Sequence, residues 1–284
     1  MSDPRQWTID ALKRLVWRLM RSTHGQKLLR LAAEERSLFL QDQILTRLGP
    51  DLVTRLGSRV HAGPFAGMEY PELKASSSAL FPKILGSYEA ELHSAIERLI
   101  ARGYPTVVNV GAGEGYYAVG LASRIAEATV YAYEADPLAR AHIVAMASVN
   151  RVSDRVIVRG RCTVGDLAAF PGSGPALLLM DCEGCEWELI DPQRVPQLAS
   201  WDVLCELHTA RGADPFPVLS ERLLATHSAH WIAVRPRDPD AYPALQSYNY
   251  DERVGVLSER TSDAGWALFL SNGLRSSESR EGTS

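Results

Sequence analysis

From residue 105 onward, short apolar runs rich in β-branched residues alternate with stretches of helical periodicity. Strands that are buried on both faces of a sheet read as continuous apolar runs, and helices between them indicate crossover connections. The pattern therefore predicts an α/β fold with a doubly wound, mostly parallel sheet covered by helices on both faces. The predicted strands are 106–110, 129–133, 156–158, 176–180, 203–206 and 266–270, with a further strand at 232–234.

Before residue 87 the pattern is mainly helical. Residues 1–30 hold seven Lys or Arg and two acids, with apolar residues at helical spacing at Ile9, Leu12, Leu15, Val16 and Leu19. This predicts a basic amphipathic helix that packs on the main domain or on another copy of the chain, and binding to an anionic membrane surface is the less favoured alternative. The helical pattern of 28–48 is expected to end at Gly49 and Pro50.

Length and composition are those of a globular protein. The chain has 284 residues, of which 46% are hydrophobic and 23% charged, close to the average of soluble domains. We divide it into an N-terminal helical extension that covers the substrate side (1–86), a main α/β domain (87–273) and a disordered tail (274–284). The net charge of -4 gives no general case for nucleic-acid binding.

Three absences predict a cytoplasmic location. The chain has no apolar stretch approaching the roughly 18 residues of a membrane span. Its first residues lack the pattern of a secretory signal. Four cysteines are too few for a disulfide scaffold in a chain of this length.

The first predicted strand runs into a glycine-rich turn and then a helix. Glycine permits positive φ and lets a ligand approach the backbone. The spacing is G-x-G-x-G over 111–115, whereas a dinucleotide fingerprint needs Gly or Ala where this chain has Tyr116. The second strand ends in Glu134, whose carboxylate can accept hydrogen bonds from both hydroxyls of a ribose. The pair predicts a nucleoside cofactor; the alternative is an ordinary tight turn and a solvated carboxylate.

Two further strand ends carry acids and an imidazole. The strand 176–180 ends in Asp181, and the strand 203–206 ends in Glu206 with His208 two residues later. Because the carboxyl ends of parallel strands meet at one edge of a sheet, we expect these groups to lie together. They suit Mg²⁺ or Mn²⁺, with Fe²⁺ and Zn²⁺ as alternatives. His208 is also a candidate general base, and the other interpretation makes both acids structural.

The turn after Asp181 holds further polar residues. Glu186 is expected to orient the following helix, because negative charge is favourable at a helix N-terminus. Cys182 and Cys185 form C-x-x-C, for which packing is favoured over a zinc site or a redox pair.

These segments resemble the FkbM-type family of class I S-adenosylmethionine-dependent methyltransferases. The resemblance rests on the glycine turn followed by two tyrosines, on Asp-x-Glu-Gly-x-Glu at 181–186 and on Glu-x-His at 206–208. It covers about residues 105–210, and 266–270 fits the last strand of the family. It implies a seven-stranded Rossmann-like methyltransferase sheet and S-adenosylmethionine as the cofactor, with His208 in place of an acid that related enzymes use. The cofactor-binding candidates are Asn109, Gly111, Gly113, Gly115, Tyr116, Glu134 and Asp181.

The resemblance also implies metal-assisted O-methylation of a small metabolite such as a glycoside. Asp181 and His208 are then the catalytic candidates, and Asp181, Glu206 and His208 are the metal ligands. The acceptor pocket is expected from 70–89 and from the insertion 235–259, whose Arg and Tyr residues could equally form a polar loop. The alternatives are a methyltransferase acting on RNA or protein, supported by the basic N-terminal helix, and a nucleotide-binding protein without turnover.

Overall fold

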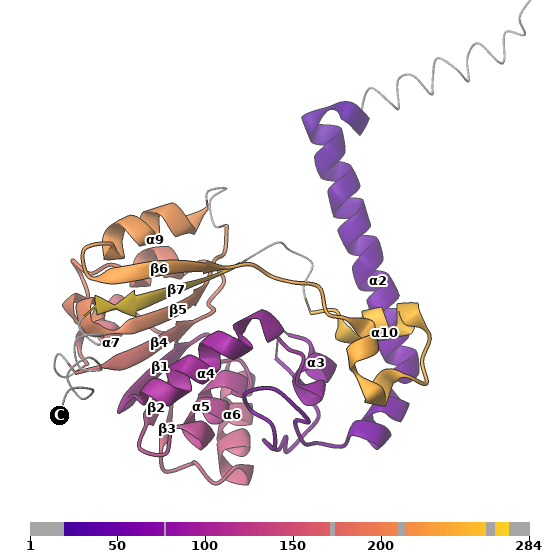
Figure 1. Cartoon of the computed structure of the whole chain (residues 1–284), viewed down its shortest axis with the longest axis horizontal. Helices are drawn as coiled ribbons and strands as arrows, with labels where there is room; N and C mark the ends of the chain where they lie inside the picture. The colour runs from indigo at the N-terminus through magenta and orange to yellow at the C-terminus, as the bar shows by residue number, and fades with distance from the viewer. Residues whose placement is uncertain (1–19, 77, 171–173, 210–213, 260–264, 273–284) are drawn as a thin grey trace, which may run out of the picture. The chain divides into compact units, whose positions relative to one another are not determined.

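The computed structural model describes residues 20–76, 78–170, 174–209, 214–259 and 265–272. The chain forms two compact units, residues 1–50 and 51–284, shown in Figure 1. The basic helix predicted near the N-terminus lies mostly outside the described residues, as does the tail after 273. The predicted functional division at residue 86 stays a prediction.

A seven-stranded sheet with the order β3-β2-β1-β4-β5-β7-β6 organises the second unit. Strands β1 to β5 are parallel to one another, and β7 runs antiparallel to both β5 and β6. This confirms the predicted doubly wound, mostly parallel sheet. Its strands are β1 (Thr106–Val110), β2 (Thr129–Tyr133), β3 (Val156–Arg159), β4 (Ala176–Met180), β5 (Asp202–Glu206), β6 (His227–Ile232) and β7 (Trp266–Ser271).

The sixth strand differs from the prediction, which placed it at 232–234. β6 instead covers His227–Ile232 and pairs only with β7, at the edge of the sheet. An edge strand needs no continuous apolar run, because part of its surface faces solvent. Ala229, His230 and Trp231 are indeed exposed, so hydrophobic patterning marked the wrong residues.

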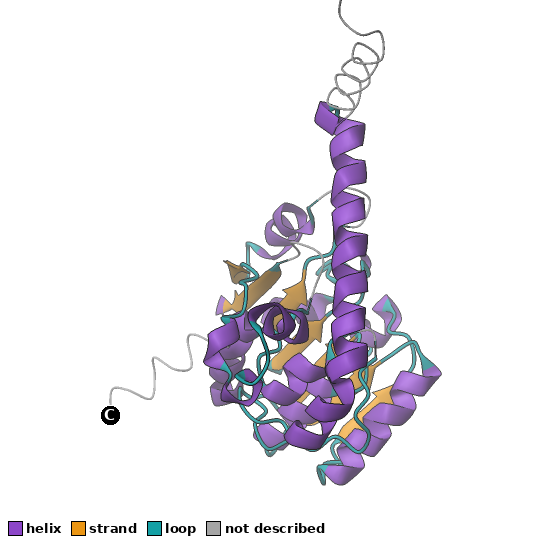
Figure 2. Cartoon of the chain, turned by 90° about the vertical axis from the view of Figure 1, so that its right-hand side faces the viewer, coloured by secondary structure: helices purple, strands orange, loops and turns teal. Residues whose placement is uncertain are grey.

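Helices cover both faces of the sheet (Figures 1 and 2). One face is buried by apolar residues of α7, α8 and α9, which form a core with Val108, Leu178, Met180 and Phe269. The other face is covered by α4 to α6. The described α-helices of the second unit beyond α2 are α3 (Leu80–Leu85), α4 (His93–Arg102), α5 (Tyr116–Arg124), α6 (Pro137–Val149), α7 (Val164–Ala168), α8 (Glu186–Leu189), α9 (Pro215–Leu223) and α10 (Tyr250–Leu257). Short 3₁₀ helices cover Ala90–Leu92, Pro196–Ser200, Pro239–Ala241 and Pro243–Leu245.

Helix α2 (Thr23–Leu56) corrects a second prediction, because it continues through Pro50. Proline removes one backbone donor and usually ends or kinks a helix. Here the turns that follow are held by tertiary packing, since Leu52 is 0% exposed and Leu56 is 5% exposed. Among the described residues, no helix combines the length and the apolar character that crossing a bilayer would require.

Candidate cofactor and metal site

The candidate site lies where the order of the strands reverses. β1 is flanked by β2 on one side and β4 on the other, with Val110 in register with both Tyr133 and Met180. In sheets of this class, ligands bind beyond the carboxyl ends of the strands at such a point. Every predicted site residue lies in or follows one of β1, β2, β4 and β5.

The glycine turn is fastened to the strands on both sides of β1. The amides of Gly111 and Ala112 both donate to the carbonyl of Tyr133, at 2.9 and 3.0 Å. Gly111 has φ +77°, and a Cβ there would collide with the carbonyl of Asp181. Only glycine allows this approach of β1 to the end of β4. The turn therefore brings the predicted cofactor and metal groups together.

Glu134 lies against the same turn, as a ribose-binding acid would. One carboxylate oxygen accepts from the amide of Gly113 at 2.8 Å, and the other accepts from the amide of Asp136 at 2.8 Å. Each oxygen keeps a further lone pair for a ligand hydroxyl. A Cβ on Gly113 would meet no described atom nearer than the carbonyl oxygen of Ser76 at 3.6 Å. The backbone here is open to a ligand, and the donor set fits a nucleoside.

Asn109 and Tyr116 lie beside the turn, but their side chains are buried in the protein. Asn109 is 1% exposed and its amide nitrogen donates to the carbonyl of Leu179 at 3.4 Å, which links β1 to β4. The ring of Tyr116 packs edge-on against Phe65 and Tyr88, with centroid distances of 5.2 and 5.4 Å. Their contact with a cofactor stays a prediction.

The predicted acids and imidazole do come together. Asp181, Glu206 and His208 offer ligand atoms that all lie within 4.8 Å of one another. His208 Nε2 is 3.7 Å from Asp181 Oδ1 and 3.6 Å from Glu206 Oε2. It is also 3.5 Å from Glu183 Oε2, whose side chain is largely exposed. Oxygen ligands with one imidazole fit a divalent cation of the Mg²⁺ or Mn²⁺ kind.

Glu186 corrects our expectation that it mainly orients α8. Its carboxylate is fully buried, and Oε1 lies 2.8 Å from Nδ1 of His208. In the neutral imidazole, a proton on Nδ1 donates to Glu186 and leaves the lone pair of Nε2 facing Asp181 and Glu206. Burial opposes protonation, but the hydrogen bond and charge of Glu186 and the charges of Asp181 and Glu183 raise the pKa of His208. Spacing along the sequence could not reveal this contact.

The C-x-x-C pair also differs from the expectation. Cys182 and Cys185 are joined by a disulfide, whereas packing was the favoured interpretation. The bond closes the turn between Asp181 and Glu186, so it lies within the candidate metal site. Cys162 and Cys205 are free and buried. Their burial, which raises the pKa of both thiols, agrees with a packing role for these two.

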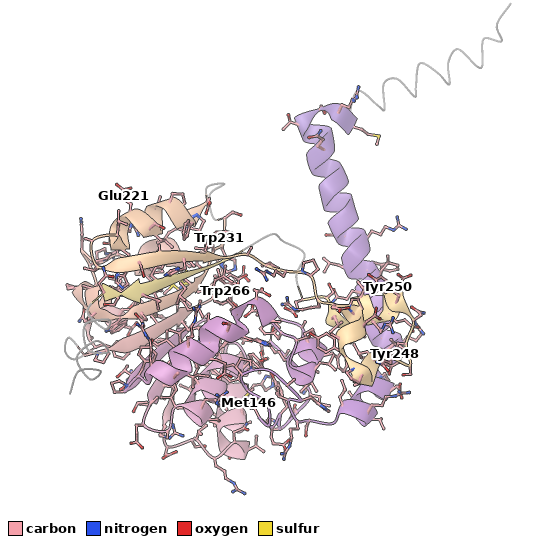
Figure 3. The ribbon with its side chains drawn as sticks, viewed as in Figure 1. Met146, Glu221, Trp231, Tyr248, Tyr250 and Trp266 are labelled. Atoms are coloured by element: carbon pink, nitrogen blue, oxygen red, sulfur yellow. A yellow bond between two sulfur atoms is a disulfide. The ribbon has the colours of Figure 1, made fainter. Side chains whose placement is uncertain are left out.

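The two segments predicted to bind the acceptor contact each other. Arg237 of the second segment donates to the carbonyl of Ser87 in the first at 2.8 Å. It also forms ion pairs with Glu91, just beyond the first segment, at 2.7 Å and with Glu259 at 2.8 Å. Glu259 also accepts from the amide of Glu89 at 2.9 Å. Arg237 thus serves to join the segments, which agrees with the structural alternative for this residue. Tyr248 lies beside α10 in Figure 3 and donates to Asp51.

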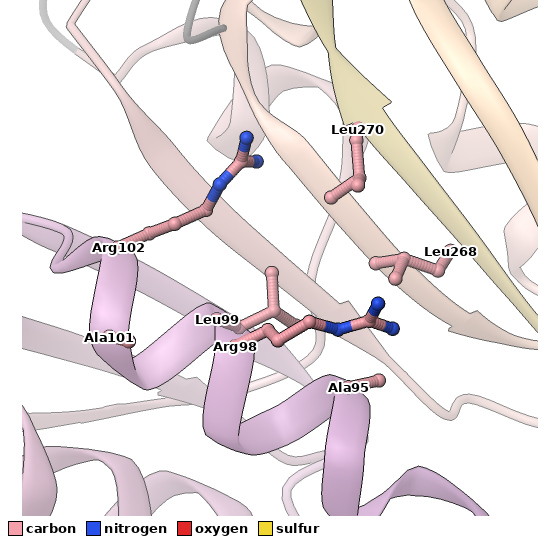
Figure 4. A pocket seen from close by; sticks show the side chains of 7 residues that line it. All are labelled: Ala95, Arg98, Leu99, Ala101, Arg102, Leu268 and Leu270. Carbon is pink, nitrogen blue, oxygen red and sulfur yellow. The ribbon is translucent and has the colours of Figure 1, made fainter. Parts of the chain in front are cut away.

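A cavity of about 470 Å³ lies elsewhere, between α4 and β7 (Figure 4). It shares no lining residue with the predicted site. Its walls are apolar apart from two arginines, and its lining residues are Ala95, Arg98, Leu99, Ala101, Arg102, Leu268 and Leu270.

No family model matches the chain, and no curated protein matches it. Among solved structures, it is similar to the O-methyltransferase TomG of Streptomyces achromogenes, involved in tomaymycin synthesis and solved with SAM. The identity is 14%, the match covers 71% of this chain and 82% of that chain, and the TM-score is 0.46.

Two further structures are similar at the same level. An O-methyltransferase from Bacillus cereus in complex with SAH has 13% identity, coverage of 62% and 78%, and a TM-score of 0.41. Precorrin 8w decarboxylase of Methanobacterium thermoautotrophicum has 17% identity, coverage of 64% and 89%, and a TM-score of 0.44. Because one fold supports several activities, the residues of the site must decide the function.

Proposed function

We propose that the protein is an S-adenosylmethionine-dependent methyltransferase that acts on a hydroxyl group of a small molecule with the help of a divalent cation. The observation that carries this proposal is the arrangement at the carboxyl edge of the sheet. There a glycine turn bound to Glu134 directly adjoins Asp181, Glu206 and His208. A nucleoside site and a cation site are therefore neighbours.

The cofactor half of the site binds adenosine. Glu134 would accept from the ribose hydroxyls, while the open backbone at Gly113 lets the ligand approach without a Cβ in the way. The preference for S-adenosylmethionine over a dinucleotide rests on Tyr116. This large, buried ring stands where a dinucleotide turn requires Gly or Ala.

In the other half of the site, Asp181, Glu206 and His208 would bind the metal ion. A bound Mg²⁺ or Mn²⁺ would lower the pKa of an acceptor hydroxyl and orient it. The hydrogen bond from His208 Nδ1 to Glu186 leaves a single ring nitrogen facing the acids. This nitrogen, Nε2, has one lone pair. It would bind the metal, or accept a proton where no metal is bound, but it cannot do both.

The chain's main task in such a reaction is alignment. Methyl transfer from a sulfonium is a direct displacement, so nucleophile, methyl carbon and leaving sulfur must be collinear. Gly111 places the cofactor turn directly on Asp181. The position of the donor and that of the hydroxyl are thus set by one contact between β1 and β4.

The finer assignment to the FkbM-type family, with a glycoside or other secondary metabolite as acceptor, belongs to the same proposal. It is supported by the Asp-x-Glu-Gly-x-Glu segment, of which Asp181, Glu183 and Glu186 all lie near His208.

Calorimetry with S-adenosylmethionine and its demethylated product tests the proposal first. We expect binding of both to the full chain; no heat at millimolar ligand overturns it. Transfer of a labelled methyl group to a panel of hydroxyl compounds, with EDTA or added Mn²⁺, tests the reaction. Binding without transfer to any acceptor would favour the nucleotide-binding alternative, and transfer to bulk RNA or protein would favour the macromolecular one.

A further inference from the structure

A buried ion pair fastens the glycine turn to the segment before the sheet. Glu114, the residue between the second and third glycines, is 1% exposed. Lys83 of α3 is 4% exposed and forms an ion pair with Glu114. The same ammonium donates to Ser78 Oγ at 2.6 Å. The sequence gives no sign that the two residues pair, because 31 positions separate them.

Glu114 gathers two more donors from the same segment. It accepts from the amide of Ser76 at 3.0 Å and from the hydroxyl of Tyr70 at 3.3 Å. Burial by itself would raise the pKa of Glu114, but Lys83 and the amide of Ser76 lower it below its ordinary value. The carboxylate is therefore ionised at neutral pH, with its charge compensated inside the protein.

Lys83 also reaches the helix that follows the turn. Its ammonium lies 4.7 Å from the ring centroid of Tyr88 and 5.4 Å from that of Tyr116, the first residue of α5. Cations are attracted to aromatic faces at such distances. One ammonium thus restrains residue 114 inside the turn and residue 116 directly after it.

A buried pair of charges is an expensive way to gain stability, because both ions lose their hydration. Such pairs can instead fix one geometry of the chain. Here the pair would fix the backbone conformation of Gly113, the residue before Glu114. Gly113 supplies both the amide that binds Glu134 and the open backbone for the ligand.

We propose that Lys83 and Glu114 are positioning residues for the cofactor, and that Tyr70, Ser76 and Ser78, which bind this pair, support the cofactor site. The pair holds the turn in the conformation in which Gly113 contacts Glu134. This inference rests on the proposed function. Our division of the chain makes residues 1–86 a helical extension that covers the substrate side, and this inference adds a role toward the cofactor.

The chain offers a matched control at the opposite edge of the sheet. Arg102 forms an ion pair with Asp202, the first residue of β5, whose side chain is fully buried. Asp202 also accepts from the hydroxyl of Tyr104 at 2.6 Å and from the amide of Ser271 at 2.7 Å. Its carboxylate is as buried as that of Glu114. It lies at the amino end of β5, whereas the glycine turn follows the carboxyl end of β1.

The experiment compares Glu114→Gln and Lys83→Gln with Asp202→Asn. Cofactor binding is measured by calorimetry, stability by urea unfolding, and turnover at saturating donor. We expect the first two variants to raise the Kd and the donor KM at least tenfold, about 1.4 kcal/mol. Their kcat should stay within about threefold, since alignment is restored once the donor is bound. Asp202→Asn should lower the urea midpoint and leave Kd within about twofold.

Two results would overturn the inference. One is an unchanged Kd in folded Glu114→Gln protein while the parent binds the cofactor, which leaves the proposed function intact. The other is an equal loss of affinity in Asp202→Asn, which would indicate general destabilisation. If Glu114→Gln does not fold, Tyr70→Phe removes one donor to Glu114; we expect a Kd two- to fivefold higher, and an unchanged Kd overturns the inference. No binding to the parent protein overturns the proposed function and this inference together.

Discussion

The two halves of the candidate site differ in how their carboxylates are bound. In the β1–β2 half, the carboxylate of Glu134 is bound by two backbone amides. In the β4–β5 half, four carboxylates surround the single imidazole of His208, within 2.8 to 3.7 Å of its nitrogens. The first half is balanced by the protein itself. The second gathers carboxylates and one imidazole at a spacing that suits a divalent cation.

Because of this difference, we expect one half to determine the affinity for the cofactor and the other to determine the rate of methyl transfer. Backbone donors and an open glycine determine affinity for a neutral sugar, whereas carboxylates determine affinity for a cation and the orientation of a hydroxyl. Substitutions in one half should therefore leave the property of the other half largely unchanged. Three predictions test that separation, and a fourth tests the ion pair that holds the glycine turn.

The largest effect is expected from the acids at the ends of β4 and β5. Glu206→Gln and Asp181→Asn should each lower the rate of methyl transfer by about a thousandfold, or about 4 kcal/mol, since the loss of a ligand removes the orientation of the acceptor. EDTA should reduce the rate of the parent protein in the same way. Glu206→Gln should still bind the cofactor by calorimetry. A rate that EDTA leaves unchanged would contradict the metal role.

A smaller effect is expected from Glu186, which does not reach the proposed ion. Partners that orient a metal-bound histidine typically contribute 10- to 100-fold to affinity, so Glu186→Gln should weaken Mn²⁺ binding by about that factor. Titration of Mn²⁺ by calorimetry or electron paramagnetic resonance measures it. Glu188→Gln, an exposed acid of the same helix, is the control. Equal affinities for the two variants would exclude the orienting role.

In the other half, Glu134→Ala should raise the Kd for S-adenosylmethionine about tenfold, or about 1.4 kcal/mol. The rate at saturating cofactor should change little, because the metal half is untouched. Asp136→Ala removes a neighbouring acid that only caps α6 and serves as the control. The ribose assignment fails if calorimetry gives a Kd for Glu134→Ala within about twofold of the parent.

The smallest effect concerns stability in acid. Because the folded-state pKa of Glu114 is lowered, its contribution to the free energy of unfolding is present at neutral pH and is lost as pH falls through that lowered value. Urea unfolding from about pH 6 down to about pH 2 should give a shallower loss of stability for Glu114→Gln than for the parent. Parallel pH profiles for the two proteins would contradict this.

Parts of the site that follow a strand could be predicted from the sequence. Strands β1, β2 and β4 have the predicted bounds, because a strand buried on both faces is marked by a continuous apolar run. The edge strand β6 lacks such a run and was misplaced. Helix α2 was ended too early, because local preference for a break at Pro50 was outweighed by packing of Leu52 and Leu56.

What the amino-acid order determined by itself was local: the parallel strands, the glycine turn, and the acids that follow β2, β4 and β5. Chain direction in a parallel sheet then brings these groups to one edge. Only the tertiary structure decided which side chains meet there. Glu186 contacts His208 across 22 positions, and Lys83 contacts Glu114 across 31. Such contacts depend on how separate elements pack, and no periodicity along the chain encodes them.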